Sequence, residues 1–411
     1  MIHFYRHRLS NGLKVLVYPD FSTPMAALDV CYHVGAKHEN PERTGFAHLF
    51  EHLMFGGSIH IPDYDLPLQQ AGGENNAYTT NDMTNYYLSI PKANLETGFW
   101  LESDRMLELA FSEESLTIQK NVVIEEFKQR NLNQPYGDIW ALIRDLAYKV
   151  HPYRWATIGK NISHIENASL DEVKAFFYRF YAPDNATLIL SGNVDVDECF
   201  QLAEKWFGPI ASRHVEKSRL PQEPEQIVYR EKTVERSVPD TCLYMAFHMS
   251  DRRSPEYYVC DLISDILSAG NSSRLYQKLV KQERLFTELD AYVSGDHDAG
   301  LFLISGKLSP NVSLEKAQAA VWQELERLQQ DPVKPEELEK VKNRLEANHT
   351  YSQMNYLSMA QELAMYEDID KAERINEQMD TYRSVLPDDI CRMAGVLFRK
   401  ENCSRLNYLA K

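Results

Sequence analysis

Apolar and polar positions follow two periods along the chain, one typical of strands and one typical of helices. The segments "LKVLVY", from Leu13, and "NNAYTTNDMTNYYLSIP", from Asn75, show the two-residue alternation of half-buried strands. The segments "LETGFWLESDRMLELA", from Leu95, and "GDIWALIRDLAYKV", from Gly137, have the apolar spacing of amphipathic helices. Strands joined by short turns favour antiparallel pairing, with helices packed on one face of the sheet. The pattern therefore predicts an α+β fold.

This pattern occurs twice. The stretch "LDVCYHVGAKHENPERTGFAHLFEHLMFGG", from Leu28, resembles "LYMAFHMSDRRSPEYYVCDLISDILSAG", from Leu243, because each has a strand with a histidine, a polar turn and a Pro-Glu pair that opens a helix. Later, "LDEVKAFFYRFYAPDNATLIL", from Leu170, resembles "PDDICRMAGVLFRKENCSRLNYL", from Pro387, each a helix that leads to a closing strand. Two matches in the same order predict two duplicated lobes, each a mainly antiparallel sheet with helices packed on one face.

The join between the two halves is the polar, charged and proline-containing stretch "ASRHVEKSRLPQEPEQIVYREKTVERSVPD". Such a composition is typical of a linker between domains. We therefore expect an N-terminal lobe over residues 1–212, a linker over residues 213–240 and a C-terminal lobe over residues 241–411.

The bulk composition narrows the range of partners and compartments. The chain of 411 residues carries 44 basic and 60 acidic side chains, a net charge of −16, which disfavours nucleic acid or an anionic membrane as a partner. No stretch has the apolar character of a signal peptide or of a membrane helix. The six cysteines are scattered without CxxC spacing and are interpreted as reduced thiols. We therefore expect a cytoplasmic protein.

The helix expected around "TGFAHLFEHLMFGG" carries two histidines and a glutamate that an apolar helix does not need. In the second repeat, the positions of His48, Glu51 and His52 are taken by leucine, aspartate and isoleucine, so the fold does not demand the histidines. His48 and His52 are spaced i, i+4 and project from one helix face, as two ligands of one metal ion do. Glu51 can reach a water on that metal without being a ligand, which is the HxxEH arrangement, an inverted HExxH motif.

A zinc ion needs a third protein ligand, and the helix "LTIQKNVVIEEFKQR", from Leu116, offers two carboxylates. Glu126 follows Val122 and Val123 by four and three residues, which predicts that it points toward buried surface. Glu125 neighbours Asn121, Lys128 and Gln129 on a wetted face. Because an inward carboxylate needs a positive partner, Glu126 is the better candidate. The N-terminal lobe would thus be the catalytic, zinc-binding one, and the C-terminal lobe a degenerate repeat that lacks metal ligands.

These motifs give the chain a resemblance to the pitrilysin/insulinase family of inverted-motif zinc peptidases. It is similar to the short bacterial members and to the mitochondrial processing peptidase subunits. The matching stretches are "LSNGLKVLV", "HLFEHLMFGG", "AGGENNAYTTNDMTNYYLSIP", "NVVIEEF", "HPYRWATIG" and "NSSRLYQKL". In that family the third ligand lies three residues after the valine of the downstream helix, which is again Glu126. The resemblance implies a zinc-dependent endopeptidase with one Zn²⁺ per chain, in which Glu51 is the general base.

The resemblance also implies how a peptide is held. In the family the substrate adds as a strand to an exposed sheet edge inside a chamber that two half-shells enclose, and the matching residues are Glu74, Asn75, Asn76 and Ala77. Small and amide side chains let another backbone approach, so the chemistry fits. From the residues alone, an ordinary edge strand remains an equal alternative.

One departure from the family pattern concerns the second half. Self-sufficient members carry an arginine and, seven residues later, a tyrosine that contact the substrate, and here these positions hold Val280 and Thr287. Arg274, Tyr276 and Arg284 lie nearby but are not assigned these roles. We therefore expect a dimer, either a homodimer or a heterodimer with a homologous subunit that carries the arginine–tyrosine pair. The alternative is a non-hydrolytic or partner-dependent subunit of a processing complex that retains the metal site.

Overall fold

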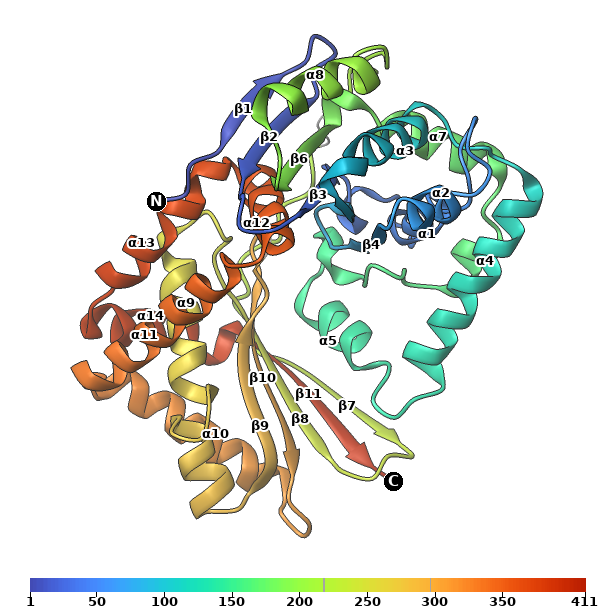
Figure 1. Cartoon of the computed structure of the whole chain (residues 1–411). Coiled ribbons are helices and arrows are strands. Elements are labelled where there is room, and N and C mark those ends of the chain that lie inside the picture. Colours follow the sequence, from blue (N-terminus) through green and yellow to red (C-terminus); the bar gives the residue numbers. More distant parts are fainter. Residues whose placement is uncertain (217–218, 296) are drawn as a thin grey trace. The chain divides into compact units, whose positions relative to one another are not determined.

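The structure is a computed structural model that describes residues 1–216, 219–295 and 297–411 (Figure 1). Its contacts divide the chain into two compact units, and each unit contains segments from both halves of the sequence. Unit 1 comprises Met1–Leu132, Trp155–Leu220 and Thr350–Asn376, and unit 2 comprises Asn133–Arg154, Pro221–His349 and Glu377–Lys411.

Unit 1 is built on a six-stranded sheet in the order β1-β2-β6-β3-β5-β4. All neighbouring strands in it pair antiparallel except β2 and β6, which are parallel. The strands are β1 (Tyr5–Arg8), β2 (Lys14–Pro19), β3 (Met25–Tyr32), β4 (Glu74–Thr79), β5 (Thr84–Pro91) and β6 (Ala186–Gly192). The helices of this unit are α1 (Phe46–Leu53), α2 (Asp65–Gln70), α3 (Leu95–Leu107), α4 (Glu113–Phe127), α6 (Ile162–Glu166), α7 (Leu170–Phe180), α8 (Val196–Phe207) and α12 (Tyr356–Ile369).

Both faces of this sheet are covered. The larger apolar core lies on one face, where α1, α3, α7 and α8 contribute side chains such as Phe50, Phe99 and Phe177. On the opposite face, α12 packs Met359 and Leu363 against the strands. Burial on both sides explains why nearly every residue of β3 is inaccessible to solvent.

Unit 2 repeats this plan with a five-stranded sheet in the order β7-β11-β8-β10-β9. Its strands are β7 (Arg230–Arg236), β8 (Cys242–His248), β9 (Phe286–Val293), β10 (Leu301–Leu308) and β11 (Cys403–Ala410). Its helices are α5 (Ile139–Ala147), α9 (Pro255–Ser268), α10 (Leu314–Gln330), α11 (Pro335–Ser352), α13 (Gln378–Ser384) and α14 (Pro387–Leu397). The main core lies between the sheet and α9, α10 and α14, while α5 covers the other face.

The two sheets have matching strand orders, with β2, β6, β3, β5 and β4 equivalent to β7, β11, β8, β10 and β9. The predicted α+β fold of two duplicated, mainly antiparallel lobes is therefore confirmed. One feature goes beyond the prediction, because each unit covers the second face of its sheet with a helix from the other half of the sequence. That helix is α12 in unit 1 and α5 in unit 2.

The segment expected as a linker, residues 213–240, contains structure that its composition does not predict. Residues Arg230–Arg236 form β7, which pairs parallel to β11 at the edge of the second sheet. Polar and charged side chains are tolerated there because an edge strand is exposed on one side.

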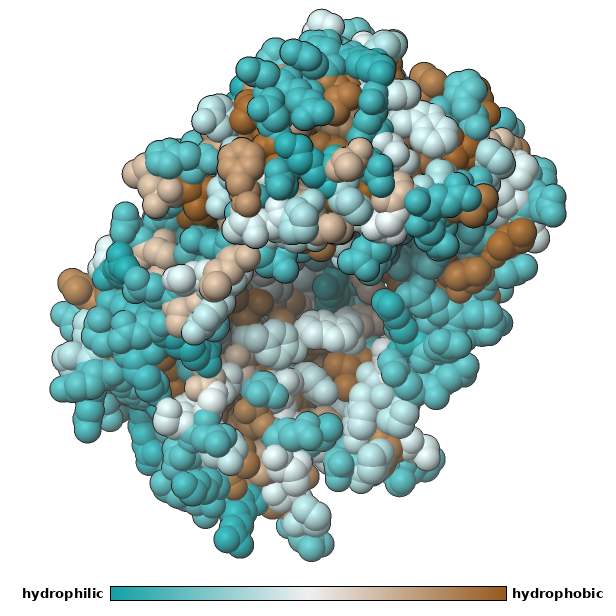
Figure 2. All heavy atoms as spheres, in the orientation of Figure 1, coloured by the Kyte–Doolittle hydropathy of each residue, from teal (hydrophilic) through white to brown (hydrophobic). Residues whose placement is uncertain are grey.

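The surface agrees with the charged composition. The face drawn in Figure 2 is mostly hydrophilic, with apolar residues in scattered patches. The six cysteines are all free in the structure, and five of them are buried. Among the described residues, no helix is long and apolar enough to cross a membrane.

Candidate metal centre

The helix that carries the two histidines, α1, begins at Phe46 rather than at the predicted Pro41–Glu42 pair. The preceding Gly45 has φ of +91°, and a Cβ there would lie 2.9 Å from the carbonyl oxygen of Ile158. This left-handed residue turns the chain immediately before the helix, so the helix cannot extend back to Pro41. In the second repeat the equivalent helix, α9, does begin at its proline, Pro255.

A buried carboxylate, Glu39, satisfies the first backbone groups of α1. Its two oxygens accept hydrogen bonds from the amides of Gly45, at 2.9 Å, and Ala47, at 2.8 Å, and from the indole of Trp155, at 3.1 Å. A carboxylate in this position suits the positive end of the helix dipole. Burial nevertheless outweighs these donors and raises the pKa of Glu39 to about 8. The sequence pattern does not mark Glu39 as a cap, because it precedes the helix by several residues and reaches the helix start through a loop.

The side chains of His48 and His52 project from α1 toward α4. Their rings lie nearly perpendicular with centroids 5.0 Å apart. The Nε2 atoms of both rings face one oxygen of Glu126, which is 3.0 Å from that of His48 and 3.3 Å from that of His52. The structure therefore brings together the three side chains that the sequence analysis selected as metal ligands.

Helix α4 presents Glu126 and not Glu125 to the histidines. It starts at the N-cap Ser112, whose hydroxyl accepts from the amide of Ser115, and a single α-helical phase then runs to Phe127. Glu125 is 62% exposed and pairs with Lys128. The reason given from the sequence was only half right, since Val123 is fully buried but Val122 is 44% exposed.

Glu51 lies beside this cluster without belonging to it. Its Oε2 is 3.2 Å from Nδ1 of His48 and accepts a 2.6 Å hydrogen bond from the hydroxyl of Thr79. Thr79 ends β4, so the carboxylate of α1 is tied to the last residue of an edge strand. Nothing in the sequence marked Thr79, because the contact joins segments that are 28 residues apart.

The electrostatics of the cluster suit a cation. Burial alone would lower the pKa of His48, but hydrogen bonds to Glu126 and Glu51 outweigh it and raise the pKa to about 9. Hydrogen bonds from His48 and His52 hold the pKa of Glu126 well below its usual range. Two carboxylates thus flank the imidazole of His48, and positive charge is stabilised at this point. Two imidazole nitrogens and one carboxylate oxygen form the donor set of a catalytic zinc site, which leaves a position for water or substrate. The residues present therefore fit a zinc ion.

The residues expected to bind substrate, Glu74 to Ala77, lie on β4 at the edge of the six-stranded sheet. On its inner side β4 pairs with β5, and Asn76 is opposite Tyr87. The backbone amide of Ala77 donates to the side-chain oxygen of Asn76 at 2.8 Å. The side chain of Asn75 donates to Asp65 at 2.7 Å. The structure thus places these four residues on an edge strand, beside the helix that carries Glu51.

Comparison with known proteins agrees with this architecture. Residues 14–148 match the family described as Insulinase (Peptidase family M16), and residues 167–345 match the one described as Peptidase M16 inactive domain. The chain belongs to the M16 peptidase family. The resemblance seen in the sequence is thereby confirmed.

Some M16 relatives resemble this chain over nearly its whole length, and others over part of it. The zinc protease PqqE of Helicobacter pylori is 27% identical over 95% of this chain and 89% of its own. The crystal structure of a protease from Helicobacter pylori matches with a TM-score of 0.93 at 26% identity and covers 100% of both chains. The mitochondrial-processing peptidase subunit beta of Saccharomyces cerevisiae is 25% identical over 61% of this chain and 55% of its own.

The two residues that the sequence analysis aligned with the family's arginine and tyrosine, Val280 and Thr287, both lie in unit 2. Val280 packs against the apolar core of unit 2, and Thr287 is an exposed residue of β9 whose hydroxyl lies 3.4 Å from the carbonyl oxygen of Lys307. Nearby, Arg274 is already engaged, since its guanidinium makes two 2.9 Å hydrogen bonds to Glu337. Unit 2 thus presents neither a guanidinium at position 280 nor a phenol at position 287.

Proposed function

We propose that this protein is a zinc-dependent endopeptidase that hydrolyses peptides or unfolded polypeptide segments. The observation that carries the proposal is the convergence of His48 and His52 from α1 with Glu126 from α4. Glu51, also on α1, lies beside this cluster. Membership of the M16 family, and the name of the Helicobacter pylori zinc protease, support it.

In this proposal one zinc ion per chain is held by His48, His52 and Glu126. When bound, it would supply Lewis acidity to the attacking water and to the scissile carbonyl. Glu51 accepts the proton of the water and passes it to the departing amine, as a positioned carboxylate can do. The hydroxyl of Thr79 holds one oxygen of Glu51, so the carboxylate keeps one orientation while it exchanges protons.

The peptide would add as a strand to β4. Backbone hydrogen bonds along this edge grip an extended chain with little regard for its side chains. In the structure the amide of Ala77 donates to the side-chain oxygen of Asn76. This side chain would move aside so that the amide can donate to a carbonyl of the substrate instead. Because Thr79 ends the same strand, a peptide bound there is brought toward Glu51.

We further propose that a second subunit completes the enzyme and encloses the substrate in a chamber. Val280 and Thr287 offer no charged clamp and no phenol donor, so the partner would be either a second copy or a homologous subunit with the arginine–tyrosine pair. The free cysteines support a reducing compartment, and we place the enzyme in the cytoplasm.

A second candidate function is a non-hydrolytic subunit of a processing complex that retains the metal site. It is favoured by the match of residues 167–345 to the family described as an inactive domain. The two candidates are separated by an assay of cleavage of an unstructured peptide, with and without a chelator. The peptidase function is supported if a chelator stops cleavage, Glu51→Gln abolishes it and Glu125→Gln leaves it intact. If the metal-loaded chain shows no cleavage, alone or with a homologous arginine–tyrosine subunit, the non-hydrolytic function is correct.

A further inference from the structure

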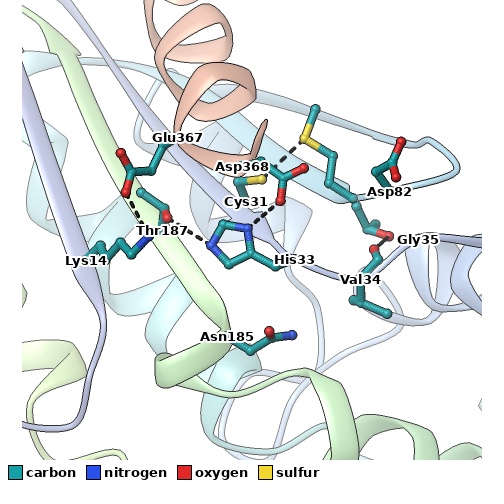
Figure 3. A network of polar contacts seen from close by, with 12 residues as sticks. Lys14, Cys31, His33, Val34, Gly35, Asp82, Asn185, Thr187, Glu367 and Asp368 are labelled. Carbon is teal, nitrogen blue, oxygen red and sulfur yellow. Dashed lines mark hydrogen bonds and ion pairs between the residues drawn. The ribbon is translucent and has the colours of Figure 1, made fainter. Parts of the chain in front are cut away.

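A second group of metal-donor side chains lies in unit 1, on the face of the sheet that α12 covers (Figure 3). Cys31 and His33 are two residues apart at the end of β3, and strand alternation directs both side chains to this face. Asp368 comes from α12, and Met83 comes from the turn between β4 and β5. Three separate segments thus meet here: three donors form a cluster, and the thioether of Met83 lies against the sulfur of Cys31.

The donor atoms are close enough to share one ion. Those of Cys31, His33 and Asp368 all lie within 4.8 Å of one another. Nδ1 of His33 is 2.5 Å from Asp368, and the sulfur of Cys31 is 3.4 Å from the sulfur of Met83. Bond lengths of about 2.0–2.3 Å would place the donors of one ion within about 4 Å of one another. Small side-chain adjustments are therefore sufficient to close the site.

The surroundings orient the histidine and leave a route to the site. Nε2 of His33 lies 3.1 Å from the hydroxyl of Thr187, and its backbone amide donates to the carbonyl of Asn185 at 3.0 Å. The contact between Nε2 and Thr187 holds the ring in place, and a metal ion at Nδ1 would replace the proton that Nδ1 shares with Asp368. The side chain of Asp368 is 4% exposed, whereas that of His33 is 23% exposed and gives access from solvent.

The second repeat shows that the fold does not demand these donors. Cys31 is opposite Thr187 in the first sheet, and the equivalent pair in the second sheet is Ala246 and Ser404. The histidine is kept as His248, and it contacts the covering helix α5 through the carbonyl of Ala147 at 3.0 Å. Packing of the covering helix therefore requires neither a thiol nor a carboxylate, so both call for another explanation in unit 1.

We propose that Cys31, His33 and Asp368, with Met83 as a soft fourth donor, bind a second metal ion of the thiophilic divalent class, such as Zn²⁺ or Cd²⁺. Thiolate, thioether and imidazole donors select such ions. A thiolate and a carboxylate together neutralise a divalent ion, which a buried site requires. Burial raises the pKa of the Cys31 thiol, so the incoming ion displaces a proton that is otherwise held.

The test is a titration of the metal-free chain with Cd²⁺, followed by the near-ultraviolet absorption of cadmium–thiolate bonds. The His48, His52 and Glu126 cluster contains no sulfur, so it is silent in this measurement. We expect a band that corresponds to one cadmium–thiolate site per chain, both in the wild-type protein, where the silent cluster also takes up cadmium, and in His52→Ala. Cys31→Ser should abolish the band, whereas Cys199→Ser, at another buried cysteine of unit 1, should leave it unchanged.

Absence of the band in the wild type, or its survival in Cys31→Ser, would overturn the proposal. If Cys31→Ser fails to fold, as judged by circular dichroism, Met83→Leu and His33→Gln decide instead. Each should weaken cadmium binding about tenfold or more, and unchanged affinity in both would also reject the site. On the His52→Ala background, where the first metal cluster is disabled, the melting temperature should rise when cadmium is added, and this rise should be lost in His33→Gln.

Discussion

The hydroxyl of Thr79 lies 2.6 Å from Oε2 of Glu51, and this hydrogen bond joins the end of the edge strand β4 to the helix that carries the metal donors. The same oxygen of Glu51 is 3.2 Å from His48. The strand proposed to bind substrate and the residue proposed as the general base are therefore held in one geometry by a single threonine.

Replacement of Thr79 by valine should lower kcat and leave the zinc content unchanged. Valine keeps the shape of the side chain but removes the donor, and such a hydrogen bond to a charged group contributes about 1.5 kcal/mol, or roughly tenfold in rate. The measurement is peptide turnover and zinc content on the same sample. Thr79→Ser should restore the rate, and a valine variant with unchanged kcat would show that the contact is not used.

Glu39 makes the stability of the helix α1 region dependent on pH. Its pKa is raised to about 8 from an ordinary value of about 4.3, so the folded state binds the proton more tightly than the unfolded state. This contribution is fully present below about pH 4.3 and is lost as the pH rises through 8. The slope is about 1.4 kcal/mol per pH unit for one proton.

The check is urea unfolding of the metal-free chain between pH 5 and 8, for the wild type and for Glu39→Gln. Glutamine keeps the size of the side chain but does not titrate, so the wild type should lose stability relative to the variant as the pH rises. Parallel pH profiles for the two proteins would contradict the assignment.

The edge of β4 can be tested at a single amide. The Ala77 amide bonds to the side chain of Asn76 and not to β5, so proline at position 77 removes a group that faces the open edge. Proline is tolerated on edge strands in such positions. We expect Ala77→Pro to lower kcat/KM about tenfold, while Ala77→Val, which keeps the amide, retains most of the activity. Equal kcat/KM values for Ala77→Pro and the wild type would place the substrate elsewhere.

The missing arginine–tyrosine pair predicts that the isolated chain is a poor peptidase. Loss of an oxyanion donor costs about 10²–10³ in rate, so addition of a homologous subunit with that pair should raise turnover by this factor. The control is the same subunit with its arginine and tyrosine replaced by valine and threonine. If the isolated chain already cleaves rapidly and no partner improves it, then Arg274, Tyr276 and Arg284 are the next residues to test.

Local patterns in the sequence predict the metal-binding helix but not the contacts between distant segments. The histidine helix and the choice of Glu126 over Glu125 followed from local spacing and from the contrast between repeats, and the structure brings these side chains together. The predicted start of α1 was wrong, because the observed start depends on the left-handed Gly45 and on the carboxylate of Glu39. The exchange of α5 and α12, the Thr79 contact and the Cys31 cluster depend on pairing of distant segments, which periodicity does not encode.

The central claim is that His48, His52 and Glu126 hold a zinc ion, and that Glu51 acts as the general base toward the attacking water. The most direct measurement is zinc content and peptide turnover on the same samples of wild type, Glu51→Gln, Glu126→Gln and Glu125→Gln, each with the partner subunit present. All four samples carry the Cys31→Ser substitution in addition, so that only the zinc at His48, His52 and Glu126 is counted. We expect about one zinc and full turnover for the wild type and for Glu125→Gln. Glu51→Gln should keep about one zinc but lower turnover by about 10²–10⁴, and Glu126→Gln should lose both zinc and turnover. Full turnover in Glu51→Gln, or full zinc in Glu126→Gln, would contradict the claim.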